Sequence, residues 1–254
     1  MSTPQVDWIP ADELVLDVRK IKSARELNAV REAGRIASQA CTLMIEALRS
    51  GKAEAEAAGE AAREVVRNGG AIHMIPCSHG EMIDYLVSNP LPGYSVSKPR
   101  AGDLARAFVY GPMFEGYYSD PGRTIIVGKQ ASGAQRELLD AGVRLCDKIL
   151  GAIRPGVPVS EVARLGDRLL AELGSGKDQA ADKFPLYGHG LGLFFEKPFI
   201  SNVMGDAQDV FLEGMVVGIE AFVTRKGVGS VGFEQNAIIT LEGTELITTT
   251  PMFW

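Results

Sequence analysis

The sequence predicts an α+β fold made of two similar halves, because one order of elements occurs twice along the 254 residues. Two helical patterns followed by short strands fill the first half, and the same order returns in the second half. A repeat of this length indicates an internal duplication. We therefore expect a single domain over residues 21–254, with halves at about 21–130 and 131–254, and an N-terminal extension over residues 1–20.

Start and stop signals define the helices of the first half. From Ser23 onward apolar residues recur at helical spacing, Ser23 and Glu26 have the capping-box pattern, and Gly51 ends the helix. An alanine-rich helix is expected from Glu54 to Arg67, closed by the pair Gly69 and Gly70. Three short apolar or β-branched segments then read as strands: AIHMIPC, LARAFVY and TIIVG.

The second half repeats this order. A long amphipathic pattern from Ser132 ends near Gly151 and Pro155, and the next helix is expected to be capped by Ser160. After Lys183, three segments read as strands: YGHGLGLFF, MVVGIEAFV and GFEQNAIITL. The helix-helix-strand order is thus predicted twice.

Composition excludes several functional classes. The net charge is −6, and no basic run follows the pattern that binds a phosphate backbone or an anionic bilayer. No apolar run approaches the roughly 20 residues that span a membrane, and the N-terminus lacks the pattern of a signal peptide. Three cysteines without a CxxC pair do not suggest disulfides or a thiolate metal site. We expect a cytoplasmic protein that binds neither nucleic acid nor membrane.

Three acids and one histidine are the candidate chemical groups. Glu220 lies six residues after Gly214 in an apolar strand, and a hairpin then returns to Glu234. Asp120 ends the corresponding hairpin of the first half, and His189 lies in the glycine-rich GHGLGL. Burying three carboxylates is costly unless a cation compensates them, so this set predicts a divalent-metal site, with zinc, manganese, iron or cobalt as candidates.

The duplication also predicts an acid that is missing. Six residues after Gly102, which matches Gly214, stands Phe108, and its neighbours Val109 and Tyr110 are not acidic either. The first half therefore supplies an aromatic side chain where the second half supplies a carboxylate.

These motifs resemble the pita-bread superfamily of methionine aminopeptidase, aminopeptidase P and prolidase. The resemblance covers about Ile21 to Leu246 and rests on six segments: IKSARELNAVREAGRIA, GYYSDPGRT, IRPGVPVSEV, YGHGLGL, EGMVVGIEAFV and GFEQNAIITLEG. It implies a curved antiparallel sheet in two pseudo-symmetric halves, with the active site between them.

The resemblance also implies the roles of the candidate groups. Five family ligands, Asp, Asp, His, Glu and Glu, hold two metals, and the second to fifth match Asp120, His189, Glu220 and Glu234. The position of the first family ligand falls within residues 108–110, and none of these three residues is acidic. This chain is therefore expected to be an atypical member with one metal or none.

The resemblance also implies two substrate-binding histidines, and this chain has neither of them. Glu196 stands at the position of one of the two. As substrate-binding candidates we take His79, Glu196, Phe108 and Tyr110. These departures favour a non-peptidase enzyme that hydrolyses a C–N bond, amide or amidine, of a small polar metabolite. With a metal-free site, His189 would act as acid and base, held by Glu220 or Glu234.

Three alternatives stay open at this stage: a single-metal aminopeptidase of Met or Xaa-Pro type, a lyase on a small organic acid, and a non-catalytic binding protein. The substrate is expected to be a small molecule. The apolar C-terminus, TTTPMFW, is expected to dock on its own core or on a second subunit, and we expect a homodimer.

Overall fold

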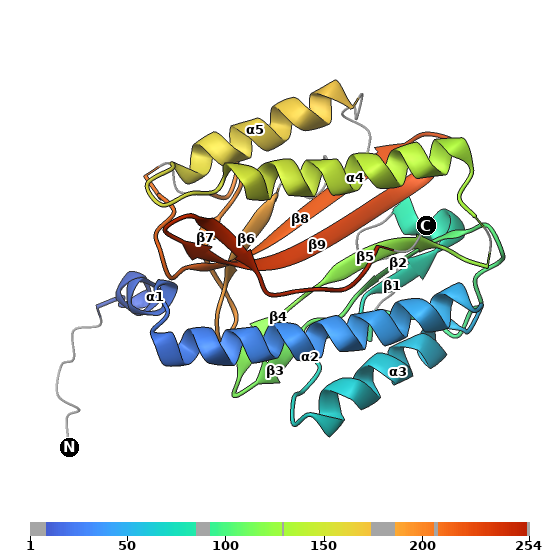
Figure 1. Ribbon diagram of the computed structural model, residues 1–254, viewed down its shortest axis with the longest axis horizontal. Coiled ribbons are helices and arrows are strands. Elements are labelled where there is room, and N and C mark those ends of the chain that lie inside the picture. Colours follow the sequence, from blue (N-terminus) through green and yellow to red (C-terminus); the bar gives the residue numbers. More distant parts are fainter. Residues whose placement is uncertain (1–8, 85–91, 129, 174–185, 206–207, 253–254) are drawn as a thin grey trace, which may run out of the picture.

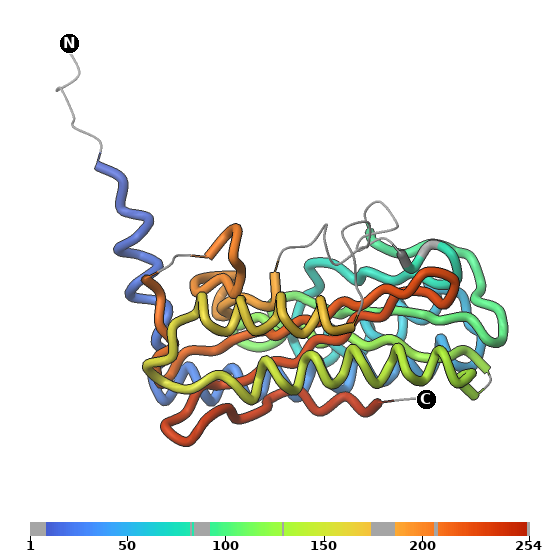
Figure 2. The backbone as a smooth tube through the Cα atoms, turned by 90° about the horizontal axis from the view of Figure 1, so that it is seen from above, coloured from blue at the N-terminus to red at the C-terminus, as the bar shows by residue number. Residues whose placement is uncertain are grey.

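The structure is a computed structural model that describes residues 9–84, 92–128, 130–173, 186–205 and 208–252. No helix within these ranges is long and apolar enough to cross a membrane. Helix α1 (Asp12–Lys20) belongs to the expected N-terminal extension, and Figure 2 shows it projecting away from the rest of the molecule.

Two pairs of helices carry the two halves. The first pair is α2 (Ala24–Arg49) and α3 (Glu54–Arg67), and the second pair is α4 (Gly133–Ala152) and α5 (Val159–Glu172). The capping box predicted at Ser23 is present, since its side chain accepts from the backbone N–H of Glu26. Figure 1 shows α2 with α3 along one part of the sheet and α4 with α5 along the other.

One eight-stranded antiparallel sheet joins the halves, in the order β1-β2-β5-β9-β8-β6-β7, with β10 paired to β9. The first half contributes three of these strands: β1 (Cys77–His79), β2 (Leu104–Phe108) and β5 (Gly122–Ile126). The second half contributes the others: β6 (Gly188–Leu191), β7 (Phe195–Phe199), β8 (Val216–Arg225), β9 (Gly229–Thr240) and β10 (Gly243–Leu246). A separate ribbon of β3 (Gly111–Phe114) and β4 (Tyr117–Ser119) and a short 3-10 helix, η1 (Gly80–Asp84), complete the fold.

The duplication is visible in strand register. In the hairpin of β8 and β9, Glu220 pairs with Glu234, and in that of β2 and β5, Phe108 pairs with Gly122. The two hairpins meet where Gly122 pairs with Glu234. The glycines that start them, Gly102 and Gly214, both have the positive φ that glycine adopts at little cost. The pita-bread architecture predicted from the motifs is therefore confirmed.

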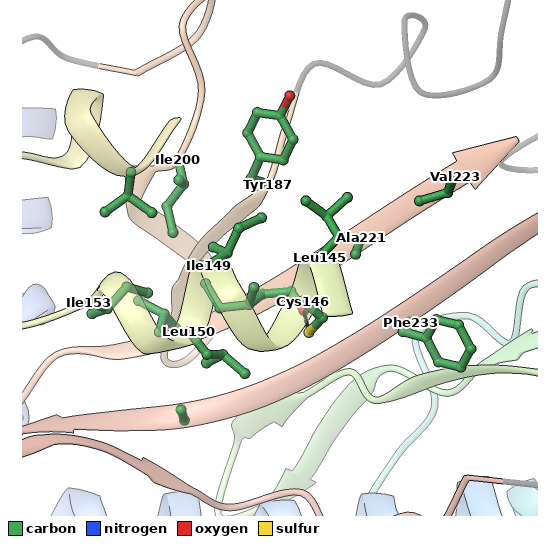
Figure 3. Packing of buried hydrophobic residues seen from close by; sticks show 14 of the residues in the cluster. Leu145, Cys146, Ile149, Leu150, Ile153, Tyr187, Ile200, Ala221, Val223 and Phe233 are labelled. Atoms are coloured by element: carbon green, nitrogen blue, oxygen red, sulfur yellow. Dashed lines mark hydrogen bonds between the residues drawn. The ribbon is translucent and has the colours of Figure 1, made fainter. Parts of the chain in front are cut away.

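Strand alternation gives the sheet two chemically different faces. On the outer face, alternate apolar residues of β8 and β9, including Val223 and Phe233, belong to one core cluster with residues of α4 and α5, and Figure 3 shows Ala221 of β8 beside Leu145 of α4. In the first half, the alanines of β2 pack against α2 and α3 in the same way. Because these helices bury the outer face, the acids lie on the inner face.

Two local predictions differ from the structure. The N-cap of α5 is Pro158, which makes no side-chain cap, so the prediction that Ser160 caps this helix is wrong. Of the strand expected over AIHMIPC, only Cys77 belongs to β1, with an isolated bridge between Met74 and Tyr110. Pro76, which has no backbone N–H to donate, lies between these two pairings.

The C-terminal segment docks on its own chain. Thr249 and Thr250 bond to Ser38 of α2, and the buried guanidinium of Arg123 donates to the carbonyl of Thr250 at 2.7 Å and to that of Glu234 at 2.7 Å. This ties the last described residues to strands β5 and β9. Phe253 and Trp254, part of the same prediction, lie outside the described residues.

Close packing at the junction of the hairpins predicts a clash. A Cβ on Gly122 would lie 2.0 Å from the Phe108 ring, so Gly122→Ala should lower the free energy of unfolding by about 1–3 kcal/mol, measured by urea titration. Gly151→Ala is the control, because no atom lies within 4 Å of its Cβ and alanine favours the helix. In a Phe108→Ala background the cost of Gly122→Ala should shrink, because the clashing ring is gone, and equal stability of wild type and Gly122→Ala would contradict this packing.

Candidate active site

Four polar side chains from four segments meet on the inner face of the sheet. Asp120 follows β4, His189 lies on β6, Glu220 on β8 and Glu234 on β9. All four are buried, with exposed fractions between 3% and 6%. Glu220 and Glu234 face each other because they are directly paired across β8 and β9. The structure thus brings together the four residues proposed from the sequence as ligands and catalytic groups.

The imidazole of His189 is oriented toward the acids. Its Nδ1 lies 3.1 Å from the carbonyl oxygen of Gly190, and this bond assigns the proton to Nδ1. Nε2 faces the carboxyl groups, 3.5 Å from Asp120, 3.7 Å from Glu220 and 3.8 Å from Glu234. An imidazole whose Nδ1 donates to a backbone carbonyl has the orientation usual for a metal ligand.

Two carboxylate oxygens in this cluster lack partners. Oε1 of Glu220 and Oε1 of Glu234 are buried and make no hydrogen bond. Burial raises the pKa of both carboxyl groups, and the charge of Asp120 raises the pKa of each further. Buried, unpaired oxygens of this kind are costly, and a divalent cation would satisfy them.

Donor geometry fits such a cation. Asp120, His189 and Glu234 each offer one ligand atom, and these atoms all lie within 4.8 Å of one another. Oxygen with imidazole nitrogen is a donor set suited to zinc, manganese, iron or cobalt. The residues present therefore fit a metal ion, with Glu220 beside it.

Asn236 and Gly218 shape the site and were not identified from the sequence. The amide of Asn236 donates to Oδ1 of Asp120 at 2.6 Å, and its oxygen accepts from Ser119 at 2.6 Å. Gly218 pairs with Asn236, and a Cβ there would lie 2.8 Å from Oε1 of Glu234. Both residues lie two positions from an acid on the same strand face, so strand alternation is the signal that could have revealed them.

A cavity of about 340 Å³ opens over the four polar groups. Phe108 and Tyr110, two of the predicted substrate-binding residues, line it. Aromatic and apolar side chains make up most of the rest: Met74, Pro76, Leu186, Phe195, Phe199, Met204 and Phe222. Phe108 and Tyr110 thus occupy the wall of the cavity, at the positions where the first family ligand was expected.

The other two substrate-binding candidates lie outside this lining. His79 bonds through Nδ1 to Oε1 of Glu54, the first residue of α3, at 2.6 Å. Glu196 forms a buried ion pair with Lys22 and a second pair with Arg19 at 3.2 Å. Its neighbour Phe195 faces the cavity instead, since successive strand side chains point to opposite faces. His79 and Glu196 therefore contact side chains that stabilise the fold and do not line the cavity.

An aromatic chain extends from the site, and its continuation through His73 to Tyr118 was not identified from the sequence. The Phe195 ring centroid lies 4.3 Å from that of His189 and 5.4 Å from that of Tyr110. Tyr110 in turn lies 4.9 Å from the exposed His73, whose Nδ1 is 3.2 Å from the hydroxyl of Tyr118. The rings come from distant segments, so only the fold reveals this wall.

Removal of the amide that holds Asp120 should weaken metal binding. Asn236→Ala is expected to lower metal affinity about 10–100-fold, because Oδ1 of Asp120 loses its donor and the carboxylate its fixed orientation. Competition titration with a chelating dye measures this. The same substitution at the exposed Asn28 of α2 is the control, and an unchanged affinity in Asn236→Ala would contradict the positioning role.

Burial of the glutamates predicts a pH dependence for the metal-free protein. Their raised pKa values mean that the folded state retains protons that the unfolded chain releases above about pH 4.3, so stability should fall as pH rises. Urea midpoints in the presence of a chelator, from about pH 5 to about pH 8, measure it. The double variant Glu220→Gln, Glu234→Gln should flatten the trend. A chelated wild type that gains stability with pH over this range would be the opposite result.

Comparison with known proteins agrees with this geometry. Among curated sequences, the chain is 29% identical over 243 residues to the Xaa-Pro dipeptidase of Pyrococcus horikoshii, and 29% identical over 245 residues to that of Pyrococcus furiosus. Each match covers 94% of this chain but only 65% and 66% of the relatives. The chain therefore spans about two thirds of the length of these relatives.

Solved structures show the same likeness. The prolidase of Pyrococcus furiosus superposes with a TM-score of 0.82 at 27% identity, over 94% of this chain and 68% of that one. An aminopeptidase P of Escherichia coli shares the fold, with a TM-score of 0.80 at 23% identity over 97% of this chain and 60% of that one. The sequence matches metallopeptidase family M24 over residues 28–241, and the chain belongs to that family.

Proposed function

We propose that this chain is a metal-dependent hydrolase that cleaves the amide bond after the amino-terminal residue of small peptides, with Xaa-Pro substrates as the first candidates. The observation that carries the proposal is the cluster in which Nε2 of His189 faces three buried carboxylates, two of them with unpaired oxygens. The names of the relatives, Xaa-Pro dipeptidases, support the type of bond. They favour the aminopeptidase alternative over a non-peptidase enzyme acting on a small polar metabolite.

The proposed site holds one ion, zinc, manganese, iron or cobalt, on Asp120, His189 and Glu234. When bound, such an ion lowers the pKa of coordinated water and polarises a carbonyl. A second ion is not part of the proposal, because Phe108 and Tyr110 line the wall and no acid stands at 108–110. One ion is sufficient for amide hydrolysis.

Glu220 is the proposed acid and base. Its Oε1 makes no hydrogen bond and lies 3.7 Å from Nε2 of His189. Glu220 is not one of the three residues, Asp120, His189 and Glu234, whose ligand atoms lie closest together. Burial raises the pKa of its carboxyl group, and the charge of Asp120 raises it further, so this carboxyl group takes up a proton more readily than an exposed glutamate does. Glu220 would take the proton from the attacking water and deliver it to the leaving nitrogen. Asn236 keeps Asp120 in place during this exchange.

Loss of a ligand should greatly reduce turnover. We expect Glu234→Gln to lower kcat/KM for a leucylproline-type substrate by about 100-fold or more, because the isosteric amide cannot supply a charged ligand. Released leucine is measured by mass spectrometry. The matched control is Glu245→Gln on β10, whose carboxylate pairs with Arg31 at 2.7 Å and lies outside the cavity.

Two results would contradict the proposal. Full activity after chelation would exclude the metal-dependent route. Turnover of amidines, or of small polar amides that are not peptides, without release of any amino-terminal residue would return the assignment to the non-peptidase hydrolase.

A further inference from the structure

The cavity has two chemically different ends. The polar end holds Asp120, Glu220, Glu234 and His189. The remaining lining is aromatic or apolar and includes Phe108, Tyr110, Phe195, Phe199 and Phe222. A pocket with this division selects an amphipathic substrate, with one charged end and one apolar body.

Stacked rings hold the apolar walls in place. Phe108 and Phe222 stack with centroids 5.8 Å apart and planes at 24°, and Tyr110 and Phe195 stack at 5.4 Å and 25°. The first pair comes from β2 and β8, and the second from the residue before β3 and from β7. Each pair therefore has one ring from each half of the fold, which makes the walls rigid surfaces for a flat or apolar group.

Charge at the polar end favours one sign of ligand. Three carboxyl groups and one imidazole form this end, and all four side chains are buried. An ammonium group is attracted to such an end, and a carboxylate within the same small cavity is repelled. Among the described residues, the lining contains no lysine or arginine that would offset this repulsion.

From the negative end and the aromatic walls, we infer that the pocket takes amino-terminal amides whose apolar body carries no free carboxylate, in preference to free dipeptides. The inference rests on the proposed function and narrows it. The α-amino group would lie toward the carboxylates and the apolar body between the stacked rings. A dipeptide, the substrate in the relatives' name, carries a free carboxylate on the residue after the scissile bond, so specificity should differ here.

A matched pair of ligands tests the inference with the metal-loaded full chain. Leucylproline and leucylprolinamide differ only in the terminal charge. We expect kcat/KM to be at least about tenfold higher for the amide, and its Kd, by calorimetry on the inactive Glu220→Gln protein, to be lower by a similar factor.

Binding and turnover separate the two proposals. Turnover of the dipeptide equal to or faster than that of the amide would overturn the inference and leave the peptidase function standing. Tighter binding of the amide without turnover of either would support the inference and overturn the function. Failure of both ligands to bind would overturn the inference.

A positive charge placed in the cavity lining tests whether charge causes the expected preference for the amide over the free dipeptide. Met204 lines the cavity and is 53% exposed, so an arginine there can extend into the cavity without a large folding cost. Met204→Arg should reduce the preference for the amide to near unity, and the neutral Met204→Gln should retain it. An unchanged preference in Met204→Arg would show that charge repulsion is not the origin of the selectivity.

Discussion

The arrangement depends on burying three carboxylates against one imidazole. Such a cluster costs free energy unless a cation joins it, and the surrounding structure keeps the acids together despite their mutual repulsion. Cross-strand pairing fixes Glu220 opposite Glu234, while Asn236 holds Asp120 by a 2.6 Å hydrogen bond. Gly218 leaves the space between them open. The fold is thus built to hold the carboxylates in place before any ion arrives.

Duplication explains why the site has unlike ends. The two central hairpins share one register, but the pair that is Glu220 and Glu234 in the second half is Phe108 and Gly122 in the first. One half therefore supplies most of the charge and the other supplies part of the aromatic wall, with Phe108 stacked on Phe222 across the junction. Two hairpins of matching register thus form an acidic end and an apolar end of one site.

Much of the fold and the core of the site could be predicted from the sequence. Helix patterns with clear caps gave α2 and α3 nearly to the residue, and the equal spacing from Gly102 and Gly214 pointed to Phe108 and Glu220. Neighbours on the same strand face, such as Asn236, could also have been derived, since alternation places them beside the acids.

Other features depend on contacts that sequence does not show. Glu196 was a substrate-binding candidate, yet its side chain pairs with Lys22, and a register irregularity between His189 and Gly190 makes the facing of β7 hard to infer from spacing. Arg123 makes contacts of the same kind. Its guanidinium is buried and donates to backbone carbonyls, including that of Thr250 near the C-terminal end of the chain. Such partners emerge only once the chain is folded.

Metal content is the most direct test of the central claim that the buried cluster is a site for one divalent ion. The protein would be purified without chelator and measured by elemental mass spectrometry, beside a Glu220→Ala, Glu234→Ala variant whose fold is checked by circular dichroism. The account predicts about one equivalent of zinc, manganese, iron or cobalt per chain in the wild type and a large loss in the folded variant. Two equivalents, or none in a folded wild-type protein that also fails to take up added metal, would contradict it.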